Sequence, residues 1–166
     1  MKHISILVPQ GALLGSIEGP RQVFSEVNTM VMGQLGKPPM FKVELVGLTK
    51  DIPVYDGLYT IKADQLIKDI SKTDLIIIPA LEGDVAKAIE KNQDFIPWII
   101  RQHSQGAEVA SLCIGAFLLA STGLVNGRKV STHWIAADAF RKAFPEVDLV
   151  EDRILTDVNG MFSSGG

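Results

Sequence analysis

Short apolar runs alternate along this chain with longer segments in which apolar residues recur every three or four positions. The first pattern is typical of strands and the second of amphipathic helices. Strands are predicted at 4–8, 41–48, 75–78 and 107–112 and, as several short ones, within 147–162, with a small hairpin at 52–61.

Helices are predicted in the segments between these strands. The first is expected to begin at Gly19-Pro20, because proline is tolerated in a first turn, and to end at Gly36. Its apolar residues fall on one face: Val23, Phe24, Val27, Met30, Val31 and Leu35. Asp84 and Asp94 are placed to cap the next two helices. The later helices are predicted at 85–91, 95–104, 114–122 and 134–144.

The alternation of strands and helices predicts an α/β fold, with a mostly parallel sheet covered by helices on both faces. At 166 residues, the chain is expected to form a single domain, residues 1–166. Ser163-Ser164-Gly165-Gly166 has the composition of a loop, so we expect the natural chain to continue and this piece to lack a last helix.

Composition and charge narrow the classes of function. The net charge is −3, so no basic surface for DNA is expected within these residues. The single cysteine, Cys113, excludes an internal disulfide and suits the reducing cytoplasm. No apolar run is long enough to span a membrane. Because no metal-ligand spacing or phosphate-binding motif occurs, we expect neither metal nor cofactor.

The most informative stretch runs from Ala110 to Phe117. A strand is predicted to end at Leu112 and a helix to begin just after Cys113, which places the thiol on a sharp turn. The N–H groups of a helix start favour a thiolate and can hold an anion or a developing oxyanion. Gly115 leaves room for close approach at the turn. Alternatively, Cys113 is a small buried apolar residue.

His133 lies between a short predicted strand and a helix, twenty residues after Cys113. It is therefore expected to return to the same edge of the sheet. A cysteine and a histidine in contact form a nucleophile and its base. The alternative is a partly buried histidine whose hydrogen bonds are satisfied within the fold.

The segment from Ala110 to Trp134 closely resembles a signature of the ThiJ/PfpI (class I glutamine-amidotransferase-like) superfamily. More narrowly, it resembles the branch found at the N-terminus of AraC-type transcription regulators. The resemblance runs from about residue 3 to the end of the chain. It is carried by Cys113–Phe117, Gly123–Arg128 and Thr132–Trp134, and also by Gly19-Pro20 with Val23-Phe24, Phe144–Val147 and Ser163–Gly166.

The resemblance implies a flavodoxin-like three-layer sandwich, often dimeric, with a pocket around the cysteine of a strand–Cys–helix nucleophile elbow. By position, the cysteine and histidine of catalytic relatives are Cys113 and His133, and their acid is replaced by Ser16. Two further departures are Ala80-Leu81, where many relatives have two glycines, and Ile114, where the protease-like branch has histidine. All three departures point away from hydrolysis.

The resemblance therefore favours a cytoplasmic sensor domain over an enzyme. We expect a homodimer that binds a small-molecule effector, while DNA is bound by a C-terminal helix-turn-helix domain outside these residues. Trp134 is expected to be either a flat wall of the pocket or part of the core. The residues implied in ligand binding are Ser16, Ala80, Leu81, Cys113, Ile114, His133 and Trp134.

Two alternatives stay open. The first is a stand-alone enzyme of the amidase or isonitrile-hydratase kind, in which Cys113 and His133 would be catalytic. The second is a redox protein in which Cys113 is oxidised to a sulfinate. The missing acid weakens this second alternative, because a protonated acid usually steadies the oxidised sulfur.

Overall fold

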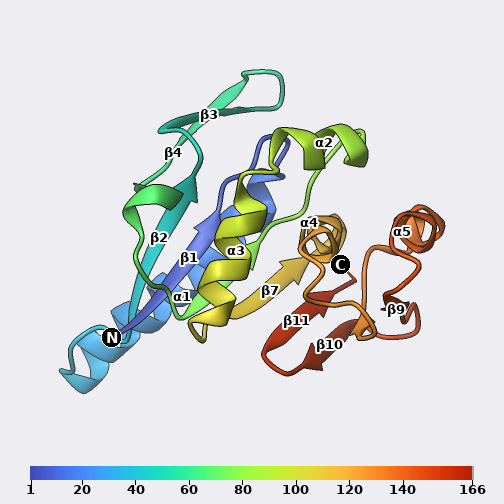
Figure 1. The fold of residues 1–166 in the computed structure, drawn as a ribbon. Helices are drawn as coiled ribbons and strands as arrows, with labels where there is room; N and C mark the ends of the chain where they lie inside the picture. The colour runs from blue at the N-terminus through green and yellow to red at the C-terminus, as the bar shows by residue number, and fades with distance from the viewer. Residues whose placement is uncertain (166) are drawn as a thin grey trace.

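A computed structural model describes residues 1–165. Within them, the main sheet has seven strands in the order β10-β11-β7-β6-β1-β2-β5 (Figure 1). All neighbouring strands are parallel except β10, which runs antiparallel to β11. The strands are β1 (Lys2–Leu7), β2 (Phe41–Gly47), β5 (Gln65–Leu66), β6 (Leu75–Ile78), β7 (Glu108–Leu112), β10 (Leu155–Val158) and β11 (Met161–Ser164).

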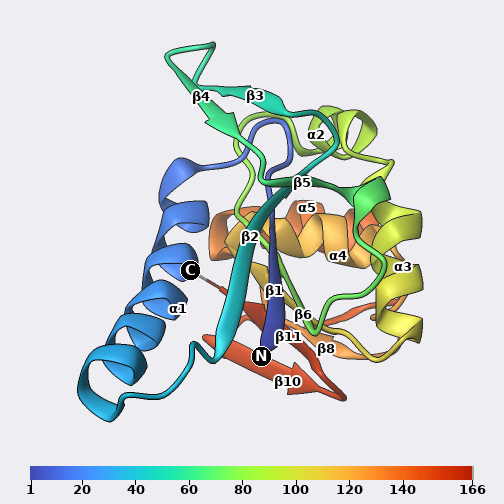
Figure 2. The same cartoon turned by 90° about the vertical axis from the view of Figure 1, so that its left-hand side faces the viewer.

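Helices cover both faces of this sheet (Figures 1 and 2). Helix α1 (Leu14–Leu35) lies on one face. The opposite face is covered by α2 (Val85–Lys91), α3 (Phe95–Ser104), α4 (Ala116–Ser121) and α5 (Ala137–Ala143). Outside the main sheet are the hairpin β3 (Asp51–Val54)–β4 (Tyr59–Lys62), the pair β8 (Lys129–Val130)–β9 (Asp148–Leu149), and the 3₁₀ turns η1 (Ile67–Asp69), η2 (Cys113–Gly115) and η3 (Trp134–Ala136).

The central strands are buried on both faces, which explains their continuous apolar sequences. In β6, Ile77 packs in the core on the α1 side, whereas Ile76 and Ile78 pack in the core beneath α2–α5. The two cores are separated only by the sheet. The predicted α/β fold, a three-layer sandwich with a mostly parallel sheet, is therefore confirmed.

The predicted start of the first helix is wrong. Helix α1 begins at Leu14, so Pro20 lies inside it rather than in its first turn. Proline lacks an N–H for the carbonyl one turn back, but its φ is helical. Ile17, which is 1% exposed, anchors the added turn in the core. The predicted end is confirmed, since Gly36 follows α1 in the left-handed conformation with φ 59°.

The apolar face predicted for α1 is only partly buried. Val31 is in the core and Phe24 packs against it, whereas Val23, Met30 and Leu35 are 61%, 53% and 62% exposed. Helical periodicity alone therefore overestimated how much of α1 the sheet covers.

Several local predictions are confirmed. The hairpin forms as β3–β4, and the Asp84 carboxylate accepts hydrogen bonds from the N–H groups of Ala86 and Lys87 at the start of α2. Asp94 stands at the cap position of α3, but its side chain makes no capping bond. The helices predicted at 114–122 and 134–144 each begin with a 3₁₀ turn, η2 and η3.

The loop predicted at the end of the chain is wrong for Ser163 and Ser164, which belong to β11. Ser163 is 1% exposed, and its hydroxyl accepts a hydrogen bond from the N–H of Ser131 and shares one with the Thr156 hydroxyl. Because these contacts satisfy its polar atom, a serine occupies a buried strand position that composition assigns to a loop. Gly166 lies outside the described residues.

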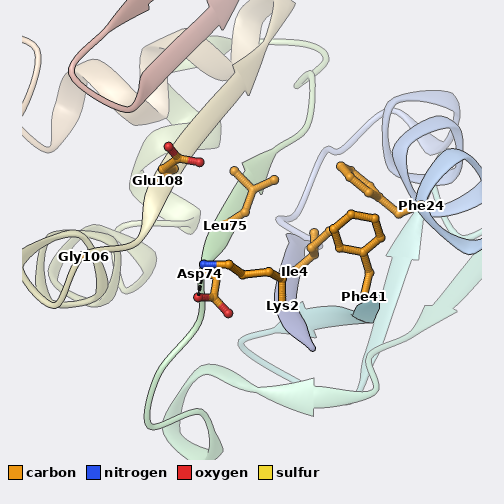
Figure 3. A pocket seen from close by; sticks show the side chains of 8 residues that line it. All are labelled: Lys2, Ile4, Phe24, Phe41, Asp74, Leu75, Gly106 and Glu108. Atoms are coloured by element: carbon orange, nitrogen blue, oxygen red, sulfur yellow. Dashed lines mark hydrogen bonds and ion pairs between the residues drawn. The ribbon is translucent and has the colours of Figure 1, made fainter. Parts of the chain in front are cut away.

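Charged side chains gather at the amino ends of β1 and β6. The Asp74 carboxylate accepts a hydrogen bond from the His3 N–H (2.8 Å). It also accepts one from Lys2 Nζ (3.1 Å), which Figure 3 shows. The His3 N–H, and then Lys2, lower the pKa of Asp74. Burial raises the pKa of Glu44, but contacts with Lys42 and His3 outweigh burial and lower it.

Acidification is expected to destabilise the fold through these two carboxyls. The pKa values of Asp74 and Glu44 are lower in the folded chain than in the unfolded chain. The stabilisation that these carboxylates give the fold is therefore complete at pH values above their unfolded pKa values of about 4. It is lost as the pH falls through the folded values. Urea denaturation at a series of pH values between about 6 and 3 measures this loss.

The matched variants for this experiment are Asp74→Asn and, as control, Asp69→Asn on the exposed turn η1. We expect Asp74→Asn to flatten the dependence of unfolding free energy on pH, and Asp69→Asn to leave its slope unchanged. A slope in Asp74→Asn as steep as in the wild type would contradict the prediction.

Candidate functional site

The sharp turn predicted at Cys113 is present between β7 and η2. Cys113 has φ 54°, a left-handed conformation that is uncommon for residues other than glycine and stores about 1–3 kcal/mol of strain. Two residues on, a Cβ on Gly115 would lie 2.8 Å from the Ile78 carbonyl oxygen and closer still to that of Pro79. The turn is therefore pressed against the end of β6, and glycine is required there by lack of space.

The Cys113 thiol is partly buried, and within residues 1–165 it makes no hydrogen bond. The Cys113 carbonyl, in contrast, accepts a hydrogen bond from the Thr132 hydroxyl at 3.0 Å. This contact joins the loop that carries His133 to the elbow. His133 thus returns to the same edge of the sheet, as the sequence predicts, but no hydrogen bond links its ring to the sulfur.

His133 has a structural task of its own. Its Nδ1 accepts a hydrogen bond from the Ile135 N–H (3.2 Å) and so caps η3. A neutral imidazole with an accepting Nδ1 carries its proton on Nε2. The remaining nitrogen is then a donor, which suits ligand binding better than proton removal from a thiol.

Trp134 does not pack in the core. The indole is 74% exposed and stacks on the His133 ring, with 5.6 Å between ring centroids and 30° between ring planes. Of the two roles considered for Trp134, the structure therefore excludes the core. The exposed indole is therefore available to contact a ligand.

Ser16, at the position of the family's acid, holds two loops together. Its hydroxyl donates to the Leu13 carbonyl (2.8 Å) and accepts from the Ala80 N–H (3.0 Å). A carboxylate has no hydrogen to give to the Leu13 carbonyl. The hydroxyl thus connects the first turn of α1 to the segment that follows β6.

Ala80 and Leu81 are 3% and 1% exposed. Leu81 pairs with Ala12 in an isolated antiparallel bridge, and its side chain packs in the core beneath α2–α5. Leu81 therefore does not crowd a pocket, because the bridge turns its side chain inward. Ile114 is likewise packed against this core.

A hollow of about 360 Å³ lies beside the loop that carries His133, and we call it the His133–Trp134 hollow. Of the seven predicted ligand-binding residues, His133 and Trp134 alone line this hollow. Its other lining residues are Thr132, Glu151, Asp152, Arg153, Ile154 and Gly165. The segment 151–154 carries no motif, so sequence reasoning could not have placed it here.

Two other features of the described residues bear on the kind of site. No group of three or more histidine, cysteine, aspartate or glutamate side chains in residues 1–165 is placed to hold a metal ion. In the same range no helix is long and apolar enough to cross a membrane. A further hollow of about 300 Å³, walled by Phe24 and Phe41, lies at the amino ends of the strands, opposite the elbow (Figure 3).

The profile of the DJ-1/PfpI family matches residues 19–166, and the chain belongs to this family. The fold is that of a candidate transcriptional regulator from Vibrio parahaemolyticus, with a TM-score of 0.85 and 19% identity. That comparison covers 100% of this chain and 85% of the Vibrio protein.

Two curated relatives differ in their described roles. The HTH-type transcriptional regulator CdhR of Pseudomonas aeruginosa is 24% identical over 107 residues, which are 64% of this chain and 31% of CdhR. The isonitrile hydratase of Pseudomonas putida is 31% identical over 108 residues, 64% of this chain and 44% of that enzyme. The chain thus matches less than half the length of either relative.

Proposed function

We propose that this chain is the effector-sensing and dimer-forming part of an AraC-type transcription regulator. In this proposal a small metabolite binds in the His133–Trp134 hollow, and its binding changes the geometry of the dimer. DNA is contacted by another part of the parent protein, since a net charge of −3 does not favour a phosphate backbone. The relationship to CdhR and the fold shared with the Vibrio protein support the proposal.

The proposal rests on one observation: His133 and Ser16, the two residues expected to activate Cys113 in an enzyme, are both hydrogen-bonded to other groups. The His133 Nδ1 caps η3, and the Ser16 hydroxyl is held between Leu13 and Ala80. A cysteine nucleophile needs a base in contact with it and a third group that orients the base. In this chain, His133 is not in contact with the thiol as a base, and Ser16 does not orient His133.

The hollow suits a small polar ligand with an apolar part. Its volume of about 360 Å³ lies within the usual range for small-molecule sites. Trp134 and Ile154 offer flat or aliphatic surface, while Arg153 offers a donor for a carboxylate or an amide oxygen. A carboxylated or amidic metabolite matches these groups.

The second candidate is an enzyme that uses Cys113 as its nucleophile. It is favoured by the strained φ of 54° at Cys113, because strain of this kind gathers at functional sites. Similarity to an isonitrile hydratase also supports it. In this case Cys113→Ala abolishes turnover of an isonitrile or amide substrate.

The test uses the full-length protein encoded by the gene of this chain. We expect it to bind DNA upstream of its own or a neighbouring gene in a mobility-shift assay, and a metabolite to change that binding. Trp134→Ala should abolish the response to metabolite while DNA binding without metabolite persists. Cys113→Ser should retain the response.

Ile135→Ala is the matched control, because Ile135 is also exposed (70%) on η3 but does not line the hollow. Its response should equal that of the wild type. If the full-length protein binds no such DNA with or without metabolites, the regulator proposal is wrong. Turnover that depends on Cys113 would instead establish the enzyme.

A further inference from the structure

A second candidate site lies where the strand order of the sheet reverses. From β1 the chain continues through α1, on one face, to the neighbouring strand β2. From β6, on the other side of β1, it continues to helices on the opposite face. The two loops diverge at this point, and ligands of open α/β sheets bind in the crevice that such loops leave.

Two adjoining hollows of about 450 and 410 Å³ occupy this region. Five residues line both hollows, and we name the shared space the β1–β6 crevice: Gln10, Gly11, Asp56, Glu82 and Lys91. They come from the loop after β1, the loop after β6, helix α2 and the tip of the β3–β4 hairpin. None of the residues near the elbow lines the crevice.

The loop after β1 forms one wall of the crevice, and the side chain of Asn92 holds this loop in place. Asn92 is completely buried, and its side-chain amide pairs with the Gln10 backbone in both directions. Asn92 Oδ1 accepts from the Gln10 N–H at 2.9 Å, and Asn92 Nδ2 donates to the Gln10 carbonyl at 2.9 Å. The Glu82 N–H donates to the Gly11 carbonyl at 2.8 Å, which joins this wall to the loop after β6.

The hairpin tip is held in a strained conformation. Tyr55 and Asp56 have φ values of 51° and 52°, and Gly57 follows with 87°. The Tyr55 hydroxyl accepts a hydrogen bond from the Leu14 N–H (3.0 Å), which fastens the tip to the start of α1. Two non-glycine residues in the left-handed region cost stability, and such strain persists where the surrounding structure enforces it, often at ligand clamps.

The charges in the crevice are unpaired within the described residues. Asp56, Glu82 and Lys91 make no ion pair or side-chain hydrogen bond there, although all three line the same space. Lys87 and Asp84, which line the larger hollow but not the shared space, pair with each other at 4.0 Å. One ammonium group and two carboxylates, all on exposed side chains, thus line the same space without pairing with one another.

We propose that the β1–β6 crevice binds a small zwitterion, a molecule that carries both an ammonium and a carboxylate group, as free amino acids do. The ligand carboxylate pairs with Lys91, and the ligand ammonium lies between Asp56 and Glu82. A simple anion would meet two carboxylates and a simple amine would meet Lys91, so only a ligand with both charges satisfies the three groups. This site is separate from the His133–Trp134 hollow and does not depend on the function proposed for it.

Titration calorimetry of the 166-residue chain tests this proposal. The zwitterionic probes are glycine, L-alanine and γ-aminobutyrate, which differ in the spacing of their charges. Butyrate and butylammonium carry one charge each. We expect at least one zwitterion to bind, and both single-charge probes to bind at least about tenfold more weakly, since each lacks one charge-assisted contact.

Variants then locate the binding. Lys91→Gln and Glu82→Gln should each weaken zwitterion binding by roughly tenfold. Glu90→Gln, an exposed position of α2 that does not line the crevice, should leave it unchanged. Trp134→Ala should also leave it unchanged, which separates this site from the one proposed for the effector.

Three results would overturn the proposal. The first is that no zwitterionic probe binds at millimolar concentration. The second is that butyrate or butylammonium binds as tightly as the best zwitterion. The third is that zwitterion binding survives both Lys91→Gln and Glu82→Gln unchanged.

Discussion

Replacing Gly115 with alanine is expected to lower the free energy of unfolding by about 3 kcal/mol or more. The new methyl group would overlap the carbonyl oxygens of Ile78 and Pro79, where it has no room. These are backbone atoms at the end of β6, so relief requires the strand and the elbow to move apart. Urea denaturation followed by circular dichroism measures the loss.

Gly19→Ala is the matched control. Gly19 also lies in a helical segment, but a Cβ placed there meets no heavy atom within 4 Å. Alanine should therefore stabilise α1 by about 0.5–1 kcal/mol, because it restricts the unfolded chain. If Gly115→Ala were as stable as the wild type, the close contact between the elbow and β6 would be disproved.

The opposite signs expected for these two glycines show what local sequence does and does not reveal. The elbow could be predicted, because an apolar run that ends at Leu112 and a glycine three residues later indicate a sharp turn from strand to helix. The reason for the glycine could not be predicted. It is the approach of β6, a strand more than thirty residues earlier in the chain.

Some features of the candidate site could likewise be predicted from the sequence, and others could not. Cys113 and His133 were found from their motifs, and the short spacing between them places both at one edge of the sheet. The hydrogen bond from Thr132 to the Cys113 carbonyl, and the wall formed by residues 151–154, depend on long-range packing that leaves no pattern in the sequence. Ser16 was identified by its position, but its role emerged only from its bond to the Ala80 N–H, 64 residues away.

Helix α1 shows a related limit. Gly19-Pro20 is a strong local signal for a helix start, and the pair does lie within a helix. Helix α1, however, begins five residues before Gly19, at Leu14. Tertiary contacts override the signal, because burial of Ile17 and the hydrogen bond between Ser16 and the Ala80 N–H offset the cost of a proline inside the helix. Local rules fail where the core supplies a larger free energy.

Asn92→Asp is expected to destabilise the fold by about 3 kcal/mol or more near neutral pH. Asn92 Nδ2 donates to two carbonyl oxygens, those of Gln10 (2.9 Å) and Ala88 (2.7 Å), and the side chain is completely buried. Aspartate puts an oxygen in place of this donor, so a buried negative charge faces two carbonyls and keeps only the hydrogen bond from the Gln10 N–H. Thermal and urea denaturation measure the loss.

The pH dependence of this deficit identifies its cause. Burial beside carbonyls raises the pKa of the introduced carboxyl above its unfolded value of about 3.9, so the charged form is the one that the fold disfavours. The deficit relative to the wild type should be largest above the raised pKa and should shrink as the pH falls toward the unfolded value. A deficit that stays constant between about pH 7 and pH 4 would show that shape, rather than charge, is responsible.

Asn159→Asp controls for the chemical change alone. Asn159 is exposed in the turn between β10 and β11 with φ 53°, a conformation that aspartate also tolerates. Its variant should lie within about 0.5 kcal/mol of the wild type. Because Asn92 also holds the Gln10 wall of the β1–β6 crevice, Asn92→Asp should weaken zwitterion binding even at temperatures where the variant is fully folded. A folded Asn92→Asp variant that binds zwitterions as tightly as the wild type would show that the Gln10 wall is not part of that site.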